Sequence, residues 1–169
     1  MRIVLLAVSL VSSMFLSACG HATSDEAAAD AAPKAQEAKS DTARPDGVLN
    51  ELYSSYFATL NGGGKADTKD YAARYFEPEL ASKFAAAANS SASPINFDIF
   101  INAQDHHDLT LGIIKRALEN TDHAIYEVHF SNNDYEQKVR IGLVKTGATW
   151  KITDIEYAKN LSLSGLLAK

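Results

Sequence analysis

The chain has 169 residues, a formal net charge of −5 and a single cysteine. The acidic balance and the lack of a basic cluster argue against nucleic acid as a partner, because phosphate binding requires dense lysine and arginine. With one cysteine the chain cannot form an intramolecular disulfide, so its folded part must be held together by a hydrophobic core.

The N-terminus has the pattern of an exported lipoprotein. Arg2 precedes an apolar run over 3–15, which suits a signal-peptide core but is shorter than the roughly 20 residues needed to span a membrane. The run ends in Leu16-Ser17-Ala18-Cys19, which resembles a bacterial lipobox. We therefore predict residues 1–18 as a signal peptide and Cys19 as a lipidated N-terminus, whose acyl chains (palmitate among them) would anchor the chain durably.

Residues 19–46 are predicted to be the lipidated cysteine followed by a flexible tether. The stretch after the cysteine has no large aliphatic or aromatic residue and contains Pro33 and Pro45, so it cannot bury enough apolar surface to offset the entropy of ordering. Gly20, rather than aspartate, follows the cysteine. By resemblance to the sorting rule of enteric-type bacteria, this indicates the outer membrane, with the domain expected to face the periplasm.

Residues 47–169 are predicted to form one domain, and its first half is helical. Apolar and aromatic residues recur at helical spacing over 48–60, with Asp46 as the expected N-cap. A second helix fits 68–76, with its first residue as the cap. A third fits 78–88, where the leading proline occupies a position that needs no N–H.

The second half changes to a period of two, which is typical of strands. Apolar residues alternate with smaller or polar ones over 109–113, 124–130 and 139–143, and a last strand begins at Trp150. A turn is expected at 131–134. Short turns between successive strands predict an antiparallel meander with one buried face. The expected fold class is therefore α+β, with N-terminal helices packed on a curved antiparallel sheet.

Several segments behind the lipobox resemble a known family. Phe97-Asp98-Ile99-Phe100, Asn102-Ala103-Gln104-Asp105 and Trp150-Lys151-Ile152-Thr153-Asp154-Ile155 together look like the small bacterial lipoproteins typified by YbjP, a family with a domain of unknown function. The order of elements also resembles the NTF2-like and cystatin-like folds. That resemblance implies a bent sheet that wraps against helices and leaves an open pocket, without choosing a function.

Asp98, Gln104 and Asp105 belong to the densest polar cluster of the domain, over 98–108. One interpretation is a metal or acid–base site. The two adjacent histidines at 106–107 point in different directions on either a helix or a strand, so they are a poor pair for one zinc ion. The alternative is a solvated loop with capping aspartates, and we expect no metal or other cofactor.

Asp154 follows Trp150 and Ile152 with strand spacing, which would point its carboxylate toward the concave side of the sheet as a general base. The alternative is structural: Asp154 bonds backbone N–H groups at a turn or bulge, as the change of phase before Tyr157 suggests. We group Asp154 with Asp98, Gln104, Asp105, Trp150 and Tyr157 as a pocket or partner surface. Neither a nucleophile–base pair nor a phosphate loop appears in the sequence, so no catalytic residue is assigned.

The first functional hypothesis is a non-enzymatic, membrane-anchored lipoprotein that binds an envelope protein or complex, with an inhibitor of a cell-wall hydrolase or an immunity protein as a special case. The second is a binder of a small molecule or peptidoglycan fragment, and the third is an aspartate-based enzyme. Aromatic side chains at helical spacing fit either a pocket lining or a core. These are Tyr53, Tyr56, Tyr71, Tyr75, Phe76 and Phe84.

Overall fold

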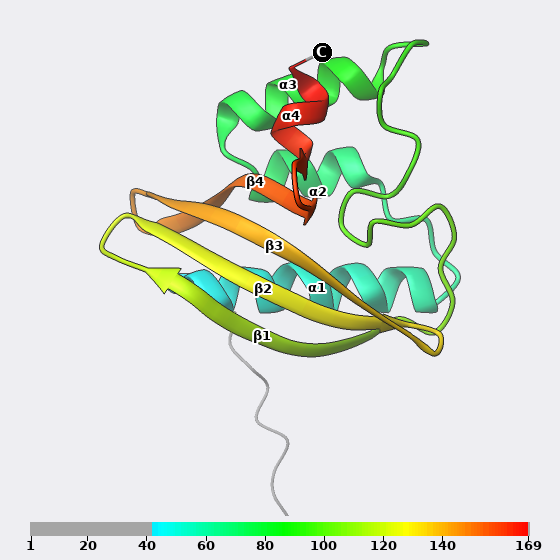
Figure 1. Ribbon diagram of the computed structural model, residues 1–169, viewed down its shortest axis with the longest axis horizontal. Coiled ribbons are helices and arrows are strands. Elements are labelled where there is room, and N and C mark those ends of the chain that lie inside the picture. Colours follow the sequence, from blue (N-terminus) through cyan, green and yellow to red (C-terminus); the bar gives the residue numbers. More distant parts are fainter. Residues whose placement is uncertain (1–41, 169) are drawn as a thin grey trace, which may run out of the picture. The chain divides into compact units, whose positions relative to one another are not determined.

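The computed structural model describes residues 42–168 (Figure 1). The predicted signal peptide, Cys19 and the tether up to residue 41 lie outside the described residues. The elements in chain order are α1 Pro45–Asn61, α2 Thr68–Tyr75, α3 Pro78–Ala88, β1 Thr110–Glu119, β2 His123–Asn132, β3 Tyr135–Thr146, β4 Thr149–Ala158, β5 Leu161–Ser162 and α4 Leu163–Leu167. Helices followed by an antiparallel sheet confirm the α+β class.

The folded part begins earlier than predicted. α1 starts at Pro45, so Asp46 lies in the first turn and is not the N-cap. The carbonyl of Ala43 accepts a hydrogen bond from the indole Nε1–H of Trp150 at 3.3 Å. Residues 42 and 43, which lie before the predicted boundary at residue 46, therefore already contact β4.

The other two predicted helices are nearly as expected. α3 has the predicted bounds, and the side chain of Glu77 caps it by accepting from the backbone N–H of Leu80 at 2.8 Å. α2 ends one residue earlier than predicted. Its cap is Asp67 rather than Thr68, because the Asp67 carboxylate accepts from the N–H of Lys69 at 2.8 Å. An aspartate at this position satisfies one of the free N–H groups of the first turn.

The five strands pair in sequence order, β1-β2-β3-β4-β5, as an antiparallel meander. The turn between β2 and β3 is tighter than predicted, because Asn132 pairs with Tyr135 and only two residues remain between the strands. Asn133 takes a φ of 56°, which suits asparagine in a tight hairpin. The sheet curves across α1 and stays open (Figure 1).

The buried face of the sheet packs on α1 and is filled with side chains. The segment between α3 and β1 contributes Ile99, Phe100 and Ile101, each 1% exposed or less. The aromatic residues of α1 and α2 contact this segment, and Tyr56 and Phe100 have ring centroids 5.0 Å apart. Tyr71 is half-buried, and the other five aromatic residues proposed as pocket or core are buried core residues.

A bulge in β4 sets the direction of Asp154. Ile152 pairs with Leu143, but Asp154 pairs with Gly142, so one residue of β4 has no partner between them. Since Leu143 faces the core and Gly142 faces outward, Asp154 lies on the outer face. The prediction that its carboxylate points to the concave side was wrong. Within the described part of the chain, no helix is long and apolar enough to cross a membrane.

Candidate functional site

Asp98 is a structural carboxylate between α1 and the buried segment before β1. The hydroxyl of Tyr56 donates to its Oδ2, and the backbone N–H of Phe100 donates to its Oδ1 at 2.9 Å. The hydroxyl of Tyr53 donates to the carbonyl of Phe100 at 3.1 Å. Burial raises the pKa of Asp98, and the hydrogen bonds from Tyr56 and the backbone oppose that shift. Its visible role is to hold the segment on α1.

Replacing Asp98 by asparagine should remove a pH dependence of stability. Because the pKa of Asp98 is raised above 3.8 on folding, the folded chain holds this proton more tightly than the unfolded chain does. The free energy of unfolding should therefore fall as the pH rises from 3.8 through the raised pKa, by at most about 1.4 kcal/mol per pH unit. Urea titrations at several pH values should show this decline in the wild type and not in Asp98→Asn. If the free energy of unfolding varied with pH in the same way in the two proteins, this prediction would be contradicted.

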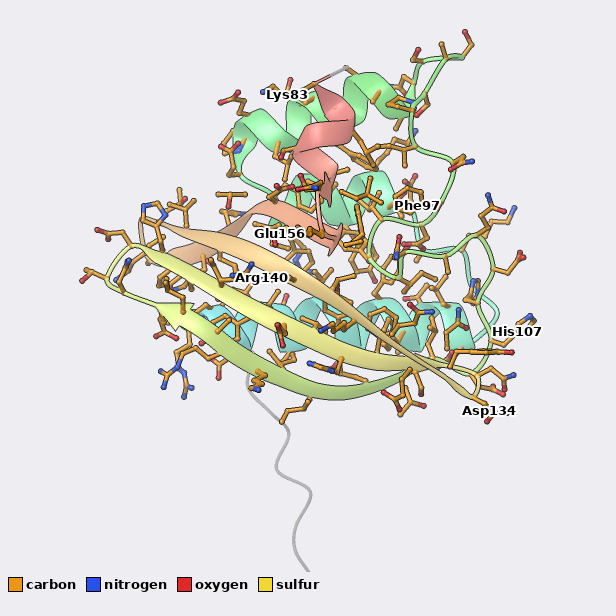
Figure 2. All side chains as sticks on the ribbon, viewed as in Figure 1. Lys83, Phe97, His107, Asp134, Arg140 and Glu156 are labelled. Carbon is orange, nitrogen blue, oxygen red and sulfur yellow. The ribbon has the colours of Figure 1, made fainter. Side chains whose placement is uncertain are left out.

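Gln104 and Asp105 are exposed on the loop that leads to β1. This loop is tied to the β2–β3 hairpin, because the side chain of Asn132 donates to the carbonyl of Asp105 at 3.0 Å and accepts from the N–H of His107 at 2.8 Å. Figure 2 shows His107 at the same end of the molecule as Asp134 of that hairpin. Residues 42–168 contain no group of three or more histidine, cysteine, aspartate or glutamate side chains placed to hold a metal.

Trp150 lies near the start of β4 and is 5% exposed. It lines a cavity of about 360 Å³ together with Glu51 and Tyr75. The hydroxyl of Tyr75 donates to Glu51 at 2.8 Å, and burial together with this bond raises the pKa of Tyr75 to about 12. Trp150 thus bonds Ala43 and lines a cavity that does not include Asp154.

Asp154 and Tyr157, in contrast, line one groove of about 660 Å³. The outer face of the sheet, mainly β3 and the end of β4, forms its floor. The C-terminal tail, which we define as residues 158–168, forms its wall and places α4 beside α3 (Figure 1). Its lining residues are Glu127, Lys138, Val139, Arg140, Asp154, Glu156, Tyr157, Ala158, Lys159, Asn160, Leu161, Ser162, Gly165 and Leu166.

Charged side chains of alternating sign cross the outer face of the sheet in one row. In the sheet register, Lys115 of β1 lies opposite Glu127 of β2, Glu127 lies opposite Arg140 of β3, and Arg140 lies opposite Glu156 of β4. Arg140 Nη1 lies 3.1 Å from Glu156 Oε2, and Figure 2 shows these two side chains close together above the sheet. Such exposed pairs add little stability, about 1 kcal/mol or less. The Arg140–Glu156 pair does show that these two charges at the groove already neutralise each other.

Asp154 attaches the tail to the sheet. Its Oδ1 accepts from the N–H groups of Ile155 and Ser164, each at 2.9 Å, and its Oδ2 accepts from the hydroxyl of Ser164 at 2.7 Å. The bond from the Ser164 N–H satisfies a backbone donor in the first turn of α4. These hydrogen bonds match the structural alternative for Asp154 and leave its carboxylate engaged at both oxygens.

Replacing Asp154 by alanine should loosen the tail. The lost hydrogen bonds to a charged acceptor should lower the free energy of unfolding by about 1–3 kcal/mol. Trypsin should also cut faster after Lys159, which lies in the turn before the tail's helix. Asp154→Asn, which keeps an acceptor oxygen, is the control and should be cut more slowly than Asp154→Ala. Equal cutting of Asp154→Ala and the wild type would contradict this role.

Tyr157 lies at the end of β4, where its ring packs edge-on against Phe97 with centroids 5.1 Å apart. Its hydroxyl is buried and has no hydrogen-bond partner within residues 42–168. Burial raises the pKa of Tyr157 above its usual value. The ring therefore supports the groove from beneath.

Sequence reasoning missed most of the groove. Lys138 and Lys159, which line the groove, were not among the predicted site residues. The C-terminal tail forms β5 and α4. No local pattern could show that β4 separates from β3 after Glu156, which creates the groove.

No family model matches the chain, and no curated protein matches it. The fold is similar to that of a chain in the crystal structure of the type VI native effector–immunity complex Tae3–Tai3 from Ralstonia pickettii. The match has a TM-score of 0.52 and 18% sequence identity, and it covers 69% of this chain and 97% of that chain. At this identity the likeness is one of fold. The similar chain, the immunity protein, was solved bound to its protein partner.

Proposed function

We propose that this protein is a lipid-anchored domain of the bacterial envelope that binds a protein partner, and that the partner is of the effector class. The observation that carries the proposal is the shared fold with an immunity chain that was solved in complex with its effector. The lipobox at Leu16–Cys19 supports placement at the outer membrane, facing the periplasm. A tethered anchor of this kind raises the local concentration of the domain at a partner in the envelope.

The chemistry of the described residues supports binding rather than catalysis. Asp98 and Asp154, the two carboxylates considered as general bases, are both engaged in hydrogen bonds that hold segments of the chain together. Both carboxylates are thus committed to structure.

A photocrosslinking scan in living cells tests this proposal. The full precursor would carry a photoreactive phenylalanine at single exposed positions on the 102–108 loop, the outer sheet face and the tail. We expect at least one discrete crosslinked species that contains a second polypeptide, and loss of that species in Cys19→Ala, which cannot be lipidated. Absence of any crosslinked polypeptide at all positions would contradict the proposal.

A second candidate is a binder of a peptidoglycan fragment or another small molecule, favoured by the volume of the groove. About 660 Å³ lies within the range of small-molecule sites, and the lining mixes apolar and polar groups. A rise in the melting temperature of the mature chain with added muropeptides, and no crosslinked polypeptide, would favour this candidate over the first.

A further inference from the structure

β3 has an unpaired edge beside the groove. Its pairing with β4 ends at Arg140 and Glu156, although β3 extends back to Tyr135. Over residues 135–139, β3 is therefore paired with β2 alone. The groove lies against this edge, since Lys138 is among its lining residues. An open strand edge next to a concave surface is the arrangement that accepts an added strand.

The alternation of the hairpin indicates which backbone groups are free. Asn132 and Tyr135 close the two-residue turn between β2 and β3, and residues that close such a turn exchange backbone hydrogen bonds. Along an antiparallel strand, successive residues direct their N–H and C=O groups to opposite sides. Glu136 and Lys138 thus direct theirs away from β2, toward the open edge. The two-residue hairpin between β3 and β4 gives the same alternation from its own end.

The groove is lined by three carboxylates and three cations, so its charges balance in number, but two of the cations have no ion-pair partner among residues 42–168. Arg140 is paired with Glu156, and the carboxylate of Asp154 is bonded to α4. Lys138 and Lys159 line the groove and have no carboxylate within 4.0 Å among residues 42–168. A carboxylate brought by an occupant of this groove would complete ion pairs with these two ammonium groups.

We propose that the groove takes an extended segment of the protein partner, which adds a strand to β3 at Glu136–Lys138. The segment carries at least one carboxylate, which Lys138 and Lys159 bind. This inference rests on the proposed function, and it specifies the surface and the chemistry of the partner. Backbone hydrogen bonds along β3 provide affinity, while the two lysines select acidic segments.

Two substitutions at residue 136 distinguish the contribution of the backbone N–H to binding from that of the side chain. Glu136→Pro removes the free N–H, whereas Glu136→Ala removes the same negative charge and keeps that N–H. Since this N–H does not bond β2, Glu136→Pro should fold, with a melting temperature close to that of Glu136→Ala. Proline is tolerated in a strand only when its N position faces an open edge.

The readout is crosslinking in cells from a photoreactive phenylalanine at Leu161, a groove residue that is 38% exposed. We expect crosslinking to fall by about tenfold in Glu136→Pro relative to Glu136→Ala, the effect of losing about 1.4 kcal/mol of binding. Lys138→Glu should also lower it, whereas Lys145→Glu, an exposed position at the other end of β3, should not. Mass spectrometry should map the crosslink to a partner segment that contains aspartate or glutamate.

Equal crosslinking in Glu136→Pro and Glu136→Ala, with Lys138→Glu unchanged, would overturn the inference. A crosslink from position 161 to a second copy of this chain would overturn it as well. If polypeptide crosslinks appear only from other surfaces, the groove proposal fails while the proposed function stands. If none appears anywhere, both fail.

Discussion

Phe100→Ala should lower the free energy of unfolding by about 3–5 kcal/mol, a large part of the roughly 5–15 kcal/mol typical of a domain. The ring is 0% exposed and lies between α1 and α2, with centroids 5.0 Å from Tyr56 and 5.8 Å from Phe76. Its removal leaves a cavity that the rigid aromatic neighbours cannot fill. Urea unfolding followed by tryptophan fluorescence would measure the loss.

Phe97→Ala is the matched control for Phe100→Ala. Phe97 lies in the same segment and packs against Tyr157, but it is only half-buried. Phe97→Ala should therefore lower the free energy of unfolding by clearly less than Phe100→Ala does. Equal losses for the two variants would show that the segment is not a core element, and would contradict the role given to Asp98 in holding it.

Leu163→Ala should cost about 2–5 kcal/mol, because this residue is the fully buried anchor of the tail. The tail forms one wall of the groove, so the loss should appear both as lower stability and as faster tryptic cleavage after Lys159. Denaturant unfolding and timed proteolysis measure the two effects on the same protein.

Leu161→Ala controls for Leu163→Ala, because Leu161 is two residues away and 38% exposed. Its substitution should change stability by less than about 1 kcal/mol. If Leu163→Ala were no more destabilising than Leu161→Ala, the tail would not be fastened to the domain as described, and the groove would lose its wall.

The fold class followed from the sequence because local signals were strong. The bounds of α3 were correct, since Pro78 at the start and the apolar spacing up to Ala88 agree with each other. Strand alternation identified the buried faces of β2 and β3. The N-cap predicted for α1 was wrong, because proline at the preceding position already fixes the helix start and Asp46 then lies within the first turn.

The candidate site was harder to predict because it depends on contacts between distant segments. A one-residue bulge reversed the direction of Asp154, since side chains alternate between faces along a strand. Asp98 was identified as a notable carboxylate, yet its partner Tyr56 is 42 residues earlier in the chain. Gln104 and Asp105 resembled site residues by composition alone and lie on an exposed loop.

The central claim is that this chain works by binding another protein. Native mass spectrometry of the chain expressed from its full sequence and purified from its own cells tests that claim most directly. We expect a complex in which the chain is joined by a second polypeptide at fixed stoichiometry. A chain found alone, or with a small molecule only, would contradict it.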